Sequence, residues 1–431
     1  MTSLAVISAL LILYATVSKP LDRRGVTAAL VLMLVGLAAG PSALGWLDVP
    51  LSGAAVEHIA EIALALLLFS DAARIDLRSL RAQLGWPARL LLIGLPLPMV
   101  AGTAAGALLF PTLSISSVAL LAIMLSATDA ALGQRVVTDP AVPPRVRQAL
   151  NVESGLNDGL SVPFFLVFVD ITLAQLHGGA VSAVVTRAAE QIGYGILAGL
   201  AAALAGALLV RLAETRDWLE SPWRELLTLS TAILAYAAAQ SLGGSGFIAA
   251  FVGGMAFGRI AGARDLPFLS FSEGVGEWLA CVVWIGFGAL ALGPALGELT
   301  WEIAVYVVLS LTVVRMAPVA LAMIGSHAQR QTVAFIGWFG PRGLASIVFA
   351  LIALDDEVPE SHLLFTVVTV TVALSVIAHG LTSGPLVGVY HRWYEAHASA
   401  APDAEEAAPA VSPRVRRERT KPGQAADLTT G

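Results

Sequence analysis

Charged residues are scarce in this sequence. Of its 431 residues only 13% are charged, whereas 57% are hydrophobic. A soluble globular protein of this length needs far more polar surface, so the composition excludes that class and indicates a polytopic membrane protein. Basic stripes are also missing, which argues against a nucleic-acid partner.

Cysteine is nearly absent, because Cys281 is the only one. It cannot form an internal disulfide, and its apolar surroundings favour a small buried side chain. No group of His, Cys and acidic residues has metal-ligand spacing, which disfavours a metalloenzyme. The segment 243–246 (GGSG) resembles a serine motif only weakly and has no well-placed His, so we expect no enzyme activity.

Long apolar runs dominate what is present. A helix needs about 20 apolar residues to cross the hydrocarbon core. The first run lacks the basic region that precedes the apolar part of a signal peptide, so we expect it to be retained. The sequence predicts an all-α membrane protein with thirteen spans: 3–18, 26–46, 54–72, 86–110, 115–138, 147–172, 183–210, 223–242, 244–260, 274–293, 300–323, 331–354 and 360–389.

Loop charges indicate the orientation, because Arg and Lys collect in cytoplasmic loops. Here they follow the odd-numbered spans, and only Arg187 departs from this pattern. We therefore expect a plasma-membrane protein with its N-terminus outside and its C-terminus in the cytoplasm. Residues 1–390 would form the membrane domain, and residues 391–431, which lack apolar periodicity, a disordered cytoplasmic tail. The loops without Lys or Arg are 41–53, 111–117, 293–300 and 355–361.

The predicted sixth span contains the polar segment 153–158 (ESGLND). Polar and charged side chains at bilayer depth are costly and indicate a function. At 1.5 Å per residue, Asp158 lies about 16 Å along the span, near the midplane. Ser154 and Asp158 are four residues apart, so they share a helix face and can offer a hydroxyl and a carboxylate to one hard monovalent cation. A carboxylate that also takes a proton would serve two substrates in turn.

Two further spans contain helix-breaking sequences. Thr128 and Asp129 in the fifth span lie at a depth similar to Asp158, within a run of residues that compete for backbone hydrogen bonds. In the twelfth span, the segment 337–343 (GWFGPRG) places Pro between glycines. We predict interrupted helices in both spans, and their positions in separate halves of the chain indicate inverted repeats around a central site. Asp129 could act as a ligand or gate, or could cap a half-helix.

Arg315 and Arg342 are the basic residues that we place well inside the hydrocarbon, where a lone charge needs a partner. Glu153 is the natural partner for Arg315, which leaves Asp158 free to titrate. Arg342 could compensate the helix ends at the break or hold an acid in place. We expect His379, in the thirteenth span, to be a hydrogen-bonded packing residue.

Together these segments resemble a known family. The segments 153–158, 127–129 and 340–343, with Arg315, are similar to the NhaP-like sodium/proton exchangers of the monovalent cation/proton antiporter superfamily, in the branch with an Asn-Asp pair. The resemblance covers essentially the whole membrane portion. It implies a homodimer with separate dimerisation and ion-carrying bundles, and crossed interrupted helices in spans five and twelve. It also implies elevator-like exchange of Na+, Li+ or K+ for H+, a role in pH homeostasis and no cofactor.

The resemblance also implies roles for individual residues. Asp158 would bind the cation or the proton, with Ser154 and the Thr128 carbonyl as further ligands of the monovalent cation. Asn157 would orient the site, and an Asn in place of a second acid is associated with electroneutral exchange. Glu153 and Arg315 would form a structural ion pair.

Two positions depart from the family pattern. Ala130 follows Asp129 where the family usually has Pro, which leaves open how far the fifth span unwinds. Relatives often have Glu near the cytoplasmic end of the third span, where this chain has Asp71; it either replaces that Glu or faces a cytoplasmic funnel. A cation channel lined by the same carboxylates is the alternative function. One titratable midplane acid between interrupted helices favours alternating access.

Overall fold

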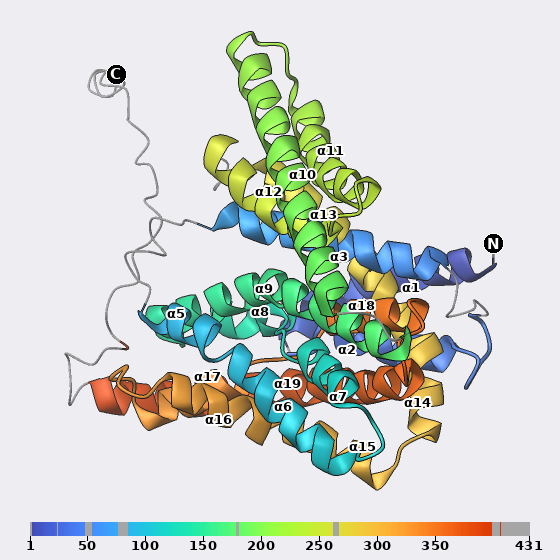
Figure 1. Cartoon of the computed structure of the whole chain (residues 1–431). Coiled ribbons are helices and arrows are strands. Elements are labelled where there is room, and N and C mark those ends of the chain that lie inside the picture. The colour runs from blue at the N-terminus through green and yellow to red at the C-terminus, as the bar shows by residue number, and fades with distance from the viewer. Residues whose placement is uncertain are drawn as a thin grey trace, which may run out of the picture.

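A computed structural model describes residues 2–23, 25–47, 54–75, 85–177, 181–261, 267–398 and Glu406, and within these residues the chain is helical without β-strands (Figure 1). The helices are α1 (Thr2–Arg23), α2 (Ala28–Ala39), α3 (Ala54–Arg74), α5 (Gly85–Leu92), α6 (Pro96–Leu109), α7 (Ile115–Met124), α8 (Ala130–Thr138), α9 (Pro144–His177), α10 (Val181–Thr215), α11 (Ser221–Ser241), α12 (Gly246–Ala261), α13 (Pro267–Gly286), the π-helix η1 (Phe287–Leu292), α14 (Gly293–Gly297), α15 (Trp301–Leu311), α16 (Val313–Ala322), α17 (Arg330–Trp338), α18 (Leu344–Asp355) and α19 (Ser361–Ala398).

The predicted all-α membrane fold is confirmed. In the described part of the chain, seven helical stretches are long and apolar enough to cross a membrane. The other predicted spans fall on the short helices α2 and α12, on α3 and α11, which are long enough but are not among the seven, or on the interrupted pairs α7 with α8 and α17 with α18. The number of thirteen crossings stays a prediction.

The fifth span breaks without the family's proline. Helix α7 ends at Met124, and the chain then runs to Asp129, whose backbone is extended (φ −85°, ψ 120°). Ser126 contributes to the end of the helix, because its hydroxyl donates to the Ile123 carbonyl at 2.7 Å. Helix α8 begins at Ala130, so a short polar run is sufficient to unwind this span.

The twelfth span breaks at its glycine and proline residues. Helix α17 ends at Trp338 and α18 begins at Leu344. Pro341 has no N–H to donate, and together with Gly340 and Gly343 it disfavours a regular helix through the segment 339–343. We call this segment the crossover and the segment 125–129 the α7–α8 link.

The helices pack in two groups, which Figure 1 shows above and below one another. Helices α10, α11, α12 and α13 pack with α3 in the upper group, and α2 contacts both α13 of this group and α19 of the other. Helices α5 to α9 and α15 to α19 form the lower group, which contains both interrupted pairs. Helices α9 and α18 contact α3, so they connect the two groups.

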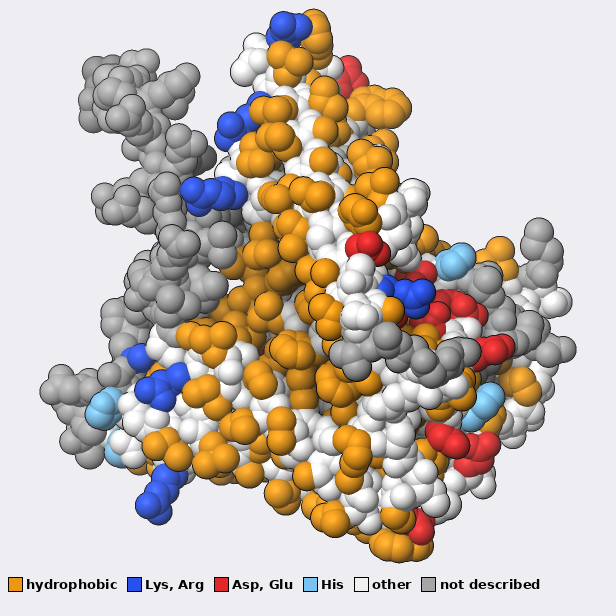
Figure 2. All heavy atoms as spheres, viewed as in Figure 1, with side chains coloured by type: hydrophobic (Ala, Val, Ile, Leu, Met, Phe, Trp, Pro, Cys, Tyr) orange, Lys and Arg blue, Asp and Glu red, His pale blue; other side chains and the backbone are white. Residues whose placement is uncertain are grey.

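The surface is that of a protein in contact with lipid. Figure 2 shows hydrophobic side chains over most of the visible face, and many of them are strongly exposed, such as Leu108 (84%) and Leu92 (76%). Arg187, the basic residue that departs from the loop pattern, lies 3.4 Å from the carboxylate of Asp170 on α9. Its acidic partner explains why Arg187 occurs on a side of the protein where the sequence otherwise places few basic residues.

The last helix continues beyond the predicted membrane domain. Helix α19 extends to Ala398, eight residues past the boundary at residue 390. Glu406 packs against the start of α17, where it accepts hydrogen bonds from the Gln329 N–H at 2.8 Å and the Thr332 hydroxyl at 2.9 Å. The rest of the predicted tail, 399–405 and 407–431, lies outside the described residues.

Candidate functional site

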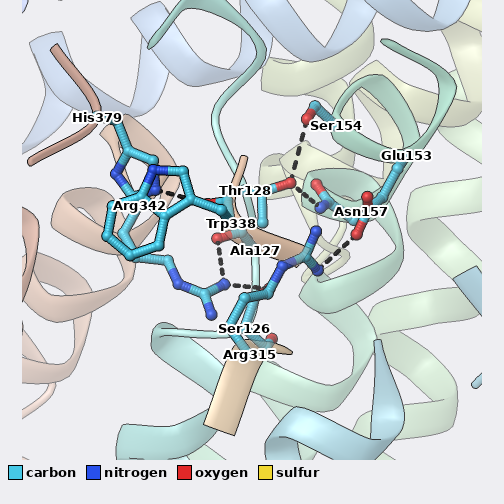
Figure 3. Close-up of polar contacts among 10 residues, drawn as sticks. All are labelled: Ser126, Ala127, Thr128, Glu153, Ser154, Asn157, Arg315, Trp338, Arg342 and His379. Atoms are coloured by element: carbon cyan, nitrogen blue, oxygen red, sulfur yellow. Dashed lines mark hydrogen bonds and ion pairs between the residues drawn. The ribbon is translucent and has the colours of Figure 1, made fainter. Parts of the chain in front are cut away.

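The polar segment of α9 meets the α7–α8 link inside the lower group. The Thr128 hydroxyl is completely buried; it lies 3.1 Å from the hydroxyl of Ser154 and accepts a hydrogen bond from Asn157 Nδ2 at 2.5 Å (Figure 3). Two segments that are 26 to 29 residues apart in sequence therefore form one polar cluster. Asp158 follows Asn157 on the same helix.

Two oxygen atoms in this cluster have unused acceptor capacity. Oδ1 of Asp158 and Oδ1 of Asn157 are both buried, and neither has a hydrogen-bond donor among the described residues. Buried acceptors without a donor are costly unless a cation or a proton satisfies them. Carboxylate, amide and hydroxyl oxygens are also the ligands that hard cations prefer. The cluster therefore suits a small cation or a proton.

Asp129 caps two half-helices at once. Its Oδ1 accepts from the Leu132 N–H of α8 at 3.1 Å, and its Oδ2 accepts from the Leu344 N–H of α18 at 3.0 Å. Its own N–H donates to the Pro341 carbonyl at 2.8 Å. A carboxylate at two helix N-termini is stabilised by both helix dipoles. Of the two roles that the sequence leaves open, this geometry is that of a cap.

Arg342 closes the other end of the α7–α8 link. Its guanidinium Nη1 donates to the carbonyls of Ser126 at 2.7 Å and Ala127 at 3.1 Å (Figure 3). These carbonyls follow the end of α7 and have no continuing helix to bond with. Arg342 is 1% exposed, so its charge compensates the negative end of a broken helix inside the protein.

Glu153 and Arg315 form an ion pair. Arg315 Nη1 donates to Glu153 Oε1 at 2.6 Å, and both side chains are buried (Figure 3). The pair joins α9 to α16 beside the cluster. Glu153 therefore has its own cation, whereas Asp158 has none among the residues that the structure describes.

Asp71 lies at the end of α3 and is half-buried. Asp71, Asp129 and Asp158 are close enough to influence one another electrostatically. Arg74, three residues further along α3, forms an ion pair with Glu273 of α13.

A narrow pocket reaches Ser154 from the side of α8. It lies between α8, the first part of α9 and the crossover. Its lining residues are Ala130, Gly133, Val136, Val137, Leu150, Asn151, Ser154 and Phe339.

Sequence reasoning assigned no site role to Ser375 and His379. Ser375 Oγ accepts a hydrogen bond from the backbone N–H of Arg342 at 2.7 Å, and the His379 ring lies against the end of α17 (Figure 3). The available signal was their spacing of four residues, which places both on one face of α19.

Comparisons with known proteins decide the family. The family model described as "Sodium/hydrogen exchanger, transmembrane" matches residues 6–388. The chain belongs to this family. Its relatives include the K(+)/H(+) antiporter NhaP of Alkalimonas amylolytica, 29% identical over 86% of this chain and 63% of the relative. The K(+)/H(+) antiporter NhaP2 of Shewanella sp. (strain ANA-3) is 26% identical over 88% of this chain and 65% of the relative. The chain thus spans less than two thirds of the length of these curated relatives.

The sodium/hydrogen exchanger fold is also found in a solved structure. The sodium proton antiporter MjNhaP1 from Methanocaldococcus jannaschii superposes with a TM-score of 0.72 at 19% identity, covering 90% of this chain and 98% of that one. At this identity the likeness shows the fold. The membership predicted from the segments 153–158 and 340–343 is confirmed.

Proposed function

We propose that this chain exchanges a monovalent cation for protons across the plasma membrane by alternating access. The observation that carries the proposal is the buried Oδ1 of Asp158, which has no donor among the described residues and lies in a cluster of oxygen atoms. Family membership supports an exchanger over a channel or an enzyme. The chain would act as a homodimer, with its N-terminus outside and its C-terminus in the cytoplasm.

Asp158 is the carboxylate that both substrates share. The cation binds Asp158 together with the Ser154 hydroxyl and the Thr128 carbonyl, while Asn157 orients the cluster through its hydrogen bond to Thr128. A proton on Asp158 removes the negative charge that the cation needs, so the two substrates exclude each other. This competition couples their movements.

The proposal of electroneutral exchange depends on which acidic side chains at the cluster have a fixed partner. Glu153 is neutralised by Arg315, and both oxygens of Asp129 cap helices. Asp158 is then the acid at the cluster that exchanges its partner during transport, and either one monovalent cation or one proton neutralises it. The site then carries the same net charge in both directions.

We propose Na+ as the preferred cation, with Li+ and K+ as the other candidates. The name of the solved relative, a sodium proton antiporter, supports Na+, whereas the names of the bacterial curated relatives support K+. The test is exchange by the purified protein in liposomes with a pH gradient, measured with each cation across pH.

Asp158→Asn tests the role of the carboxylate. An Asn side chain neither takes up a proton in the pH range of a folded protein nor supplies a negative charge. Cation-dependent proton flux should therefore disappear while the protein remains folded. Asp139→Asn is the matched control, because Asp139 caps the Ala141 N–H on the far side of α8 and should leave exchange unchanged. Retention of most transport in Asp158→Asn would refute the proposal.

An imposed membrane potential separates electroneutral exchange from a channel. With no pH gradient, the proposed one-for-one exchanger shows no net cation uptake driven by voltage. Voltage-driven uptake would reject electroneutral exchange, and uptake without any proton movement would indicate a cation channel.

A further inference from the structure

Helix α19 holds both ends of the crossover. At one end, the His379 Nε2 atom lies 2.8 Å from the carbonyl oxygen of Trp338, the last residue of α17. At the other end, the backbone N–H of Arg342 donates to Ser375 Oγ at 2.7 Å. Both α19 side chains are buried, with 4% of His379 and 0% of Ser375 exposed.

The His379 ring lies between two carbonyl oxygens. Its Nε2 lies 2.8 Å from the Trp338 carbonyl, and its Nδ1 lies 2.8 Å from the carbonyl of Ser375 in its own helix. A carbonyl oxygen only accepts, so a ring nitrogen that carries a hydrogen donates to the carbonyl that it faces. The Ser375 hydroxyl, which accepts from the Arg342 N–H, lies 3.2 Å from Nδ1 and can donate to it when Nε2 carries the hydrogen.

The ring of His379 also makes packing contacts that any test must separate from its hydrogen bonds. The Trp338 ring lies with its centroid 5.3 Å from that of His379, and its Nε1 donates to the Thr382 hydroxyl at 3.0 Å. The centroid of the Phe339 ring lies 6.4 Å from that of His379.

The crossover is connected to the cation cluster at two points. The guanidinium of Arg342 binds the carbonyls of Ser126 and Ala127, and the Pro341 carbonyl accepts from the Asp129 N–H. Thr128 lies between these contacts in the α7–α8 link. A displacement of the crossover would therefore move the Thr128 carbonyl relative to α9.

We propose that His379 and Ser375 are positioning residues of the cation site, which hold the crossover so that the α7–α8 link presents Thr128 to the ion. They touch neither the cation nor the proton. This inference rests on the proposed function, because it concerns how tightly the transported cation is bound.

Three variants separate hydrogen bonding from packing. His379→Phe keeps an aromatic ring beside Trp338 but removes both nitrogens. His379→Gln loses the ring but keeps an amide N–H that can reach the Trp338 carbonyl. Ser375→Ala removes the acceptor of the Arg342 N–H and keeps the helix. All three are measured in the full chain in liposomes, with rates normalised to folded protein.

Two residues of α19 provide matched controls away from the crossover. Thr371 is completely buried and its hydroxyl donates within its own helix, to the Val367 carbonyl at 2.7 Å. Thr371→Val keeps its shape and removes that hydroxyl. His391 lies 3.0 Å from the carbonyl of Ala141, and His391→Phe removes a similar contact near the end of the helix.

The expected result is a change in KM against an unchanged maximal rate. Loss of one buried hydrogen bond should raise the KM for the cation about 3- to 10-fold in His379→Phe and Ser375→Ala. His379→Gln should bring KM back to within about twofold of the wild type, and both controls should stay within that range.

Other outcomes overturn the proposal. A wild-type KM in His379→Phe, or a KM in His379→Gln as high as in His379→Phe, would assign His379 to packing alone. If His379→Phe does not fold, the KM of Ser375→Ala is compared with that of Thr371→Val. A KM that is raised in Ser375→Ala alone supports the proposal, and equal KM values overturn it. A wild-type protein that exchanges no cation would refute the proposed function and this inference with it, whereas normal wild-type exchange with unchanged variants refutes only the positioning role.

Discussion

Arg315 and Glu153 are 162 residues apart in the sequence, and a 2.6 Å hydrogen bond joins their side chains inside the protein. Both are about 2% exposed. A buried charge whose partner is removed is strongly destabilising, whereas loss of both charges is tolerated better. This pair therefore constrains the packing of α9 against α16.

Removing one member of the pair should expose that asymmetry. Arg315→Ala should lower the free energy of unfolding by about 3–5 kcal/mol, and Glu153→Gln combined with it should cost less than the sum of the single changes. Denaturant unfolding of the purified variants measures this. The half-exposed pair Arg224 and Glu214, 3.2 Å apart, is the control, with a coupling of about 0–1 kcal/mol expected. Additive losses at Glu153 and Arg315 would argue against the pair.

Asp129→Asn should weaken both interrupted spans. The amide keeps one acceptor oxygen, so either the Leu132 N–H or the Leu344 N–H loses its cap, at a cost of about 0.5–2 kcal/mol. Thermal unfolding reports the stability, and liposome exchange should fall with it because the crossover is released. Ser114→Ala removes the N-cap of α7, which bonds the Ser117 N–H at 3.1 Å, and should destabilise without slowing exchange. An Asp129→Asn protein with wild-type stability would contradict this account.

Two glycines near the cluster should respond differently to Ala. A Cβ at Gly343 would collide with the carboxylate of Asp129, whereas a Cβ at Gly155 meets no atom within 4 Å. Gly343→Ala should displace Asp129 and reduce exchange, because the close approach of the crossover to the α7–α8 link needs a residue without a side chain. Gly155→Ala should keep wild-type exchange and gain up to about 1 kcal/mol of helix stability. Equal exchange rates in the two variants would show that the approach is not needed.

The turn after α18 should make stability depend on pH. Partial desolvation, followed by the charges of neighbouring acids, raises the pKa of Asp356 above its ordinary value. The folded protein then holds this proton more tightly than the unfolded chain. The resulting stabilisation is complete below the unfolded pKa and is lost as pH rises through the folded pKa. The neighbouring acids are Asp355, Asp170 and Glu61.

Asp356→Asn removes this pH dependence. Relative to the wild type, the variant should have a higher melting temperature at neutral pH, and the difference should disappear in acid below the unfolded pKa. Melting curves across pH measure it. If the melting temperature of Asp356→Asn exceeded that of the wild type by more in acid than at neutral pH, this would contradict the raised pKa of Asp356.

The sequence alone was sufficient for the membrane fold, both helix breaks and the pairing of Glu153 with Arg315. The physical reason is the bilayer, which makes every charge at depth costly, so the few that are present must have partners or functions. Helix breaks are equally visible, because Pro and runs of small polar residues compete with regular backbone hydrogen bonds. The break at residues 125–129 forms although Ala130 takes the position of the usual proline.

Only the tertiary structure decided how the breaks are joined. Asp129 caps α18 across 215 residues of sequence, Arg342 binds backbone carbonyls of the α7–α8 link, and His379 binds the Trp338 carbonyl. Each contact uses a backbone group, and every residue except proline carries the same N–H and C=O, so no side-chain pattern indicates the partner. The identity of the polar residues was therefore readable from the sequence, but the backbone atoms that they hold were not.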